Sequence, residues 1–224
     1  MALVSQTFEL SPFTVVDMRA VGDLTIEAPE PGAMPSLTVE TAEAILPKLR
    51  NEVKDGRLVL TFDLMWWEWI TWWFKWMTLS DKKVKYTLKA TGVSEIKLAG
   101  SGTVAADGLT ADHLALKITG SGKIRLGDIQ AGQLSVRVSG SGDFSLAGKV
   151  EQQEININGS GNVEAAELES NRTYITISGS GSTKVKAKNE LSVKISGAGR
   201  VSYFGEPQTF NQRVSGSGRI EKLG

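Results

Sequence analysis

The sequence predicts an all-β protein: a right-handed, single-stranded parallel β-helix (solenoid) with a tryptophan-rich helical insertion. Three observations support this fold class. A Gly-Ser-Gly motif recurs through the C-terminal two thirds of the 224 residues, strand-like alternation flanks the motif, and all six tryptophans lie between Trp66 and Trp76. We therefore expect N-terminal coils over 1–62, the insertion over 63–83 and the repeat solenoid over 84–224, the first and last forming one continuous domain.

The repeat has a nearly constant period of 18 to 20 residues, which antiparallel sandwiches and barrels rarely keep. Its middle residue is serine in six copies and Ala198 in the other. We expect the first glycine of each copy to form a structural corner of one coil. These seven glycines are Gly100, Gly120, Gly140, Gly159, Gly179, Gly197 and Gly216.

The residues around each corner alternate between apolar and polar, as in Val136-Arg137-Val138 before a corner and Lys123-Ile124-Arg125-Leu126 after one. Alternation with β-branched residues predicts half-buried strands. Glycine permits positive φ at the corner and lets neighbouring backbones stack closely. A single coil could not bury its apolar side, so the copies should stack in parallel, with the right-handed crossover that such connections favour.

The N-terminal blocks complete a family resemblance. Phe13–Glu27 has the pattern of opening strands, and Thr38–Leu60 follows with a Lys-Asp-Gly turn at 54–56. Together with the Gly-Ser-Gly ladder, these blocks resemble the head GIN domain family of putative auto-transporter adhesins, which are β-solenoids. The resemblance covers most of the chain apart from about 64–81. It implies a protein of the cell envelope or surface, often exported or lipid-anchored, with no catalytic residues to assign.

The first residues of the chain bear on where in the cell the protein is located. Met1–Thr14 contains Glu9, no basic cluster and no long apolar run, so it is not a secretory signal peptide. No stretch has 18 uninterrupted apolar residues. We therefore expect an envelope or surface location from the resemblance, with a cytoplasmic position peripheral to the membrane as the alternative.

The insertion, between two strand-like flanks, is strongly apolar. Its polar residues Glu68, Thr71, Lys75 and Thr78 are spaced by three, four and three residues, which predicts one narrow polar stripe on a helix of about 16 residues. A β-hairpin is the alternative, but the segment offers no Gly, Asn or Pro for a central turn. We expect its contact surface to comprise Trp66, Trp67, Trp69, Trp72, Trp73, Phe74 and Trp76.

Three partners could cover this surface. The helix could pack on the solenoid as a cap. It could also form a self-association seam, because Trp66, Trp69, Trp73 and Trp76 follow the spacing of helix–helix contacts. Finally, it could lie in a membrane interface, where tryptophan is favoured. A homo-oligomer and a membrane surface are therefore both expected partners, and they are compatible with each other.

A second feature is a row of basic residues three positions before the corner glycines. Asn156 and Thr176 occupy two of the seven positions, and the other five are Lys97, Lys117, Arg137, Lys194 and Arg213. Because these residues alternate with apolar ones, they should point outward and stack into a basic face. Exposed lysines also protect strands from aggregation, which is the simpler explanation. The functional alternative is a surface for anionic lipid or acidic polysaccharide.

Composition excludes several kinds of site. The chain has no cysteine, a single histidine (His113) and a formal net charge of zero. We therefore expect no metal, no cofactor and no nucleic-acid partner. Acidic residues are scattered along the repeat, without the clustered carboxylates of a glycosidase. The sequence favours a non-catalytic, adhesion-type envelope protein that contacts membrane or its own copies through the tryptophan-rich helix. The alternative is a β-helix that binds or cleaves polysaccharide.

Overall fold

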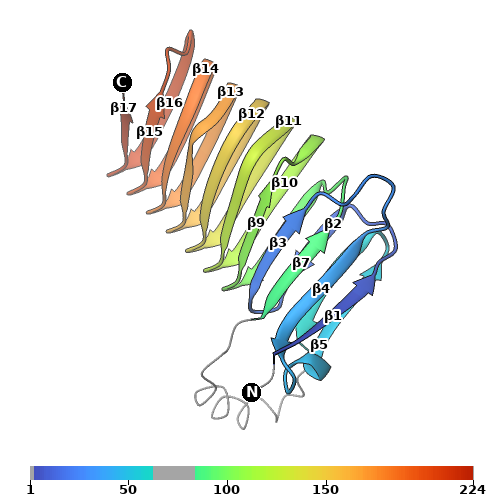
Figure 1. Cartoon of the computed structure of the whole chain (residues 1–224). Coiled ribbons are helices and arrows are strands. Elements are labelled where there is room, and N and C mark those ends of the chain that lie inside the picture. The colour runs from blue at the N-terminus through green and yellow to red at the C-terminus, as the bar shows by residue number, and fades with distance from the viewer. Residues whose placement is uncertain (1–2, 63–83, 224) are drawn as a thin grey trace, which may run out of the picture.

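The structure is a computed structural model that describes residues 3–62 and 84–223 (Figure 1). Within these residues the only helical element is the short 3-10 helix η1 (Leu46–Lys48), so the all-β prediction is confirmed there. The strands of the N-terminal part are β1 (Leu3–Glu9), β2 (Val15–Met18), β3 (Asp23–Glu27), β4 (Ser36–Ala42), β5 (Leu49–Lys54), β6 (Arg57–Phe62) and β7 (Lys85–Lys89). The strands of the repeat are β8 (Glu95–Gly100), β9 (Thr103–Asp107), β10 (Thr110–Gly120), β11 (Lys123–Gly140), β12 (Asp143–Gly159), β13 (Asn162–Gly179), β14 (Ser182–Gly197), β15 (Arg200–Phe204), β16 (Thr209–Gly216) and β17 (Arg219–Lys222).

The repeat forms the predicted parallel solenoid. Each of the long strands β11–β14 leaves one Gly-X-Gly corner and runs into the next, and it pairs in parallel with its neighbour. Every corner glycine aligns with the corner glycine of the next coil, as Gly120 does with Gly140 and Gly140 with Gly159. Figure 1 shows the coils stacked one behind another along a single axis.

The coils present two broad faces, which we name by chain direction. The entry face holds the strands that run into corners, namely β6, β2, β8, β10, the second halves of β11–β14, and β16, together with β5, which is antiparallel to β6. The exit face holds those that leave corners, namely β7, β3, β9, the first halves of β11–β14, β15 and β17, together with β4, which is antiparallel to β7, and β1, which pairs with β4. Figure 1 shows β1, β4, β7 and β3 side by side on the exit face.

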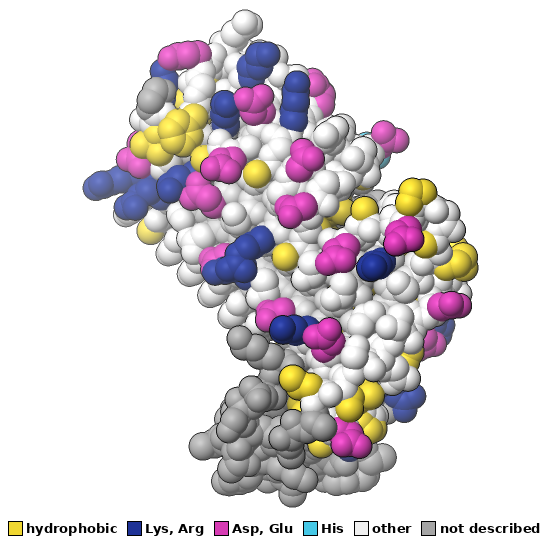
Figure 2. Space-filling view, viewed as in Figure 1, with side chains coloured by type: hydrophobic (Ala, Val, Ile, Leu, Met, Phe, Trp, Pro, Cys, Tyr) yellow, Lys and Arg dark blue, Asp and Glu magenta, His cyan; other side chains and the backbone are white. Residues whose placement is uncertain are grey.

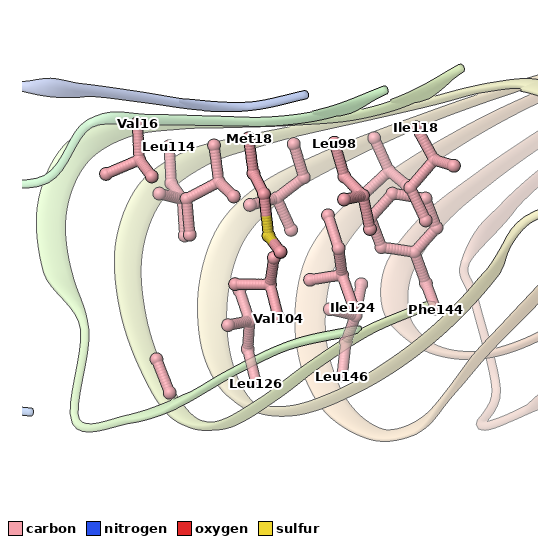
Figure 3. Packing of buried hydrophobic residues seen from close by; sticks show 14 of the residues in the cluster. Val16, Met18, Leu98, Val104, Leu114, Ile118, Ile124, Leu126, Phe144 and Leu146 are labelled. Carbon is pink, nitrogen blue, oxygen red and sulfur yellow. The ribbon is translucent and has the colours of Figure 1, made fainter. Parts of the chain in front are cut away.

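The hydrophobic core lies between the two faces. Alternate residues of each strand point inward, and the same inward position is filled by a similar side chain in successive coils, such as Ile118, Val138 and Ile157. Figure 3 shows Met18, Leu98 and Ile118 of the entry face approaching Val104, Ile124 and Phe144 of the exit face. Because the whole row is aliphatic or aromatic, the coils pack as one continuous core.

Two glycines are required at each corner for different reasons. Gly140 has a φ of +119°, and a Cβ there would lie 2.6 Å from the carbonyl oxygen of Gly120 in the preceding corner. A Cβ on Gly142 would lie 2.4 Å from Cγ2 of Ile118. Backbone hydrogen bonds cross the corner, because the Ser141 amide donates to the Gly120 carbonyl at 2.9 Å. The corner thus combines backbone conformation, close stacking and a continuous hydrogen-bond ladder.

The N-terminal part departs from the simple parallel stacking that the sequence predicts. The coil β2–β3 turns at Ala20–Gly22 and lies between β6–β7 on one side and β8–β9 on the other. Beyond β6 and β7, strands β5, β4 and β1 pair antiparallel. Order along the axis therefore differs from order along the chain, and reversed strands cover the N-terminal end of the core, where Leu37 and Val39 are buried.

The predicted tryptophan-rich helix over 63–83 lies outside the described residues. In the chain, this segment connects Phe62 at the end of β6 to Val84 just before β7. These two strands align with β2 and β3, whose connection is the corner at 20–22. The insertion thus occupies a corner position in the sequence of coils.

The two requirements on the first corner glycine can be separated by experiment. Gly100 and Gly140 have nearly the same φ, +118° and +119°, but a Cβ on Gly100 meets nothing within 4 Å. Gly100→Ala should therefore destabilise the fold only through backbone strain, whereas Gly140→Ala should destabilise it through the same strain and through the clash with the Gly120 carbonyl. We expect Gly140→Ala to lower the unfolding free energy by at least about 1 kcal/mol more than Gly100→Ala, measured by chemical denaturation. Equal midpoints and slopes for the two variants would contradict the stacking argument.

Candidate anion-binding face

The structure places the five sequence-predicted basic residues in one outward row of the entry face. Strand pairing aligns Lys97 with Lys117 and Lys117 with Arg137, and at the other end it aligns Lys194 with Arg213. Asn156 and Thr176 fill the two central positions. At about 4.8 Å between neighbouring strands, the row runs about 29 Å along the solenoid.

Four of these cations carry charge that no described carboxylate neutralises. Lys97 Nζ lies 2.9 Å from Glu95 Oε1, so it belongs to a surface ion pair. The exposed side chains of Lys117, Arg137, Lys194 and Arg213 form no ion pair with the described part of the chain. The row therefore has two separated pairs of positive charges, and between them the Glu154 carboxylate, which accepts a hydrogen bond from Asn156 at 2.8 Å, adds a negative charge.

A row of small polar side chains runs beside the basic row, directly before the corner glycines. Its members are exposed and aligned in the same register: Thr119, Ser139, Asn158, Ser178, Ser196 and Ser215. Hydroxyls and amides donate hydrogen bonds to phosphate or carboxylate oxygens. The entry face therefore combines fixed cations with neutral donors on a flat and regular surface.

The exit face has a different charge pattern. Lys123 Nζ lies 3.4 Å from Asp143 Oδ2, and Lys184 Nζ lies 3.0 Å from Glu164 Oε2. Figure 2, viewed as in Figure 1, shows basic and acidic side chains side by side on this surface. Because charges of both signs occur along its rows, the described part of the exit face offers no extended surface of one sign.

An acidic residue at the N-terminal end of the basic row is neutralised within the fold. Asp17 aligns with Lys97, and its carboxylate is 5% exposed. Arg19 donates to it at 2.8 Å, and Arg57, 40 residues further along the chain, approaches to 3.4 Å. Burial alone would raise the pKa of Asp17, but the hydrogen bonds and charges of the two arginines outweigh burial and hold the pKa below its ordinary value of 3.8. The sequence alone did not reveal this cluster.

Two open grooves, of about 480 and 560 Å³, run along the side opposite the corners and share Lys149 and Val150 in their walls. The larger is lined by charged residues and amides that include Glu169, Asn171 and Lys186. The hydrogen bond and charge of Lys186, 2.6 Å away, lower the pKa of Glu169. A glycosidase needs a carboxylic acid with a raised pKa, so Glu169 has the opposite tendency.

The remaining predictions concern the tryptophan-rich segment, metal ligands and membrane-spanning helices. Trp66, Trp67, Trp69, Trp72, Trp73, Phe74 and Trp76 lie outside the described residues. In the part that is described, no three histidine, aspartate or glutamate side chains come close enough to share a metal ion. None of the helical structure in that part has the length and apolar character needed to cross a membrane.

The Asp17 cluster gives a pH-dependent prediction. The pKa of Asp17 is lowered in the folded state, so its stabilisation is fully present above about pH 4 and is lost as the pH falls through the folded value. Asp17→Asn should lower stability at pH 7 and flatten the loss of stability between about pH 4 and pH 2. Denaturation midpoints across this range measure the effect. Asp143→Asn is the control, because that carboxylate is 40% exposed in a surface pair. An Asp17→Asn variant with the wild-type acid profile would show that the cluster does not contribute to stability.

Known structures share this architecture. A putative adhesin from Bacteroides fragilis is 23% identical, with a TM-score of 0.86 over 99% of this chain and 97% of the other. A putative lipid binding protein from Parabacteroides distasonis is 21% identical, with a TM-score of 0.75 over 99% and 97%. A putative adhesin from the same species is 19% identical, with a TM-score of 0.73 over 99% and 97%. At these identities the likeness shows the fold alone.

The family of the chain is shown by its sequence. No curated protein matches the chain. The sequence profile of one family does match, and it spans residues 12–207, from just before β2 to just after β15. The chain therefore belongs to the family described as putative auto-transporter adhesin, head GIN domain.

Proposed function

We propose that this protein is a non-catalytic, adhesion-type β-solenoid of the cell envelope that binds an anionic membrane surface through its entry face. The observation that carries the proposal is the row formed by Lys117, Arg137, Lys194 and Arg213, whose charges have no carboxylate partner among the described residues. A flat row of fixed cations with neighbouring hydroxyls suits a surface of phosphate headgroups. The name of the similar lipid binding protein agrees with this choice.

The tryptophan-rich segment is the second part of the proposal. Six tryptophans within eleven residues exceed what a cap on the solenoid requires, and tryptophan is favoured at the level of lipid headgroups. The segment therefore supplies apolar contact and the entry face supplies charge. If the segment instead joins copies of the protein, each oligomer presents several basic rows, and binding gains avidity.

A polysaccharide is the alternative ligand, and the grooves opposite the corners are the observation that favours it. Their walls combine the amides of Gln130, Asn171 and Gln208 with paired charges. Such donors and acceptors suit sugar hydroxyls. In that case charge changes on the entry face would leave binding unchanged, which separates the two candidates.

Charge removal from the entry face tests the main proposal. Changing Lys117, Arg137, Lys194 and Arg213 to Gln should reduce partitioning onto vesicles of phosphatidylcholine and phosphatidylglycerol by roughly a thousandfold, because four surface cations are lost. Co-sedimentation at low salt measures the effect. The matched control changes Lys123, Arg125, Lys184 and Arg200 of the exit face to Gln, with the same loss of net charge. Equal losses in the two variants would show that net charge, and not the row, is responsible.

Removal of tryptophan tests the second part. In a variant with Trp66, Trp69, Trp73 and Trp76 changed to Ser, we expect loss of vesicle binding or of self-association with little change in thermal stability. Each buried indole removes about 200 Å² from water, so losing four lowers an association constant by orders of magnitude. High salt distinguishes the two contacts, because it weakens binding to anionic lipid and spares an apolar seam. Unfolding of the variant would show that the segment belongs to the core.

A further inference from the structure

Within the described residues, the C-terminal end of the solenoid has an unpaired edge on both faces. Among the described strands, β16 pairs only with β14 and β17 pairs only with β15. All eight residues of β16 are exposed, including Phe210 (38%) and Val214 (42%), although these two continue buried inward rows through Leu191 and Ile195. Figure 2 shows apolar side chains reaching the surface at this end. Such an edge exposes both backbone hydrogen-bonding groups and the end of the core.

We propose that this end pairs with the same end of a second copy of the chain, in a two-fold dimer. The axis runs along the strand direction between the two faces, so that one corner at 216–218 lies over the other. This rotation places β16 against β17 of the second copy. Because β16 runs toward its corner and β17 runs away from its corner, the two edges meet antiparallel, and the ladder continues through the dimer.

The residues of the two edges are complementary in this arrangement. Counting outward from the corner, Val214 opposes Ile220 of the second copy, and Arg213 opposes Glu221 of the second copy. The first pair points into the core, and the second pair points outward. Ser215 then opposes Arg219, and Gln212 opposes Lys222, so no like charges meet. Each of these pairs occurs twice through the symmetry, which gives two apolar contacts and two ion pairs.

An alternative two-fold would pair each of the two edge strands with its own copy. Because directly opposed residues of an antiparallel pair point to the same side, this symmetry sets one residue of β17 opposite itself. With Ile220 at that position, Arg219 opposes Glu221 of the second copy, whereas Arg213 has no acidic partner because β16 contains none. The two arrangements therefore differ in whether Arg213 pairs with Glu221. This surface does not include residues 63–83, and Arg213 is the one residue that it shares with the basic row.

Charge exchange across the proposed interface tests it in the full chain. Sedimentation equilibrium of the wild type should give twice the monomer mass. Arg213→Glu and Glu221→Arg should each raise the dimer dissociation constant by about tenfold or more, because each creates two like-charge pairs. The double variant Arg213→Glu, Glu221→Arg should restore dimerisation. Arg200→Glu reverses an exposed charge one coil further in, and it should leave the mass unchanged.

The outcomes separate this contact from others. A monomeric wild type overturns the proposal, and so does a dimer that neither single charge reversal weakens, as expected if tryptophans alone join the copies. Single variants that weaken the dimer without rescue in the double variant also overturn it, because the loss would then come from distortion of the last coil. Far-ultraviolet circular dichroism and thermal unfolding of every variant confirm that the solenoid is intact.

Discussion

The structure depends on the close stacking of glycine corners. From Gly120 to Gly197, each first glycine adopts a positive φ and lies against the carbonyl of the corner before it, and the following amide donates to that same carbonyl, as Ser141 does to Gly120. This contact fixes where each coil turns, and therefore fixes the register of both faces. The inward rows that form the core and the outward rows that form the surface are consequences of that register. A shift of one residue at a corner would exchange the two sets.

The same constraint turns a sequence period into surface chemistry. Residues about 20 positions apart become neighbours, so a basic residue repeated at one position of the coil gives a continuous row, as Lys117 and Arg137 do. Opposite charges in neighbouring coils give ion pairs instead, as Lys123 and Asp143 do on the exit face. Whether a face attracts an anionic surface is therefore decided coil by coil, without any change in the core.

The alignment of the corners also determines which features could be predicted from the sequence. The basic row was predictable because every residue in it is counted from a corner glycine, and corners align. The coil of β2 and β3 was not, since Ala20–Gly22 lacks the full motif and the coil lies between strands from later in the chain. The contact between Asp17 and Arg57, 40 residues apart, depends on that rearrangement. Gln153 is similar: it replaces an apolar residue in the inward row, and its amide donates to Ser170 at 2.9 Å and to Thr173 at 3.0 Å. Thr173 is aligned with Gln153 in the register of β12 and β13, and the Ser170 hydroxyl lies 2.6 Å from that of Thr173.

The two proposed surfaces have a joint geometric consequence. A rotation axis along the strands carries the entry face of one copy onto the side of the exit face of the other. A dimer joined at its C-terminal ends would therefore direct its two basic rows to opposite sides, with the antiparallel pairs of β1, β4 and β5 at its far ends. Such a dimer cannot place both rows on one flat membrane, so pairing would not increase its affinity for a single surface. It could instead hold two anionic surfaces together, and bridging of that kind is what an adhesion-type protein requires.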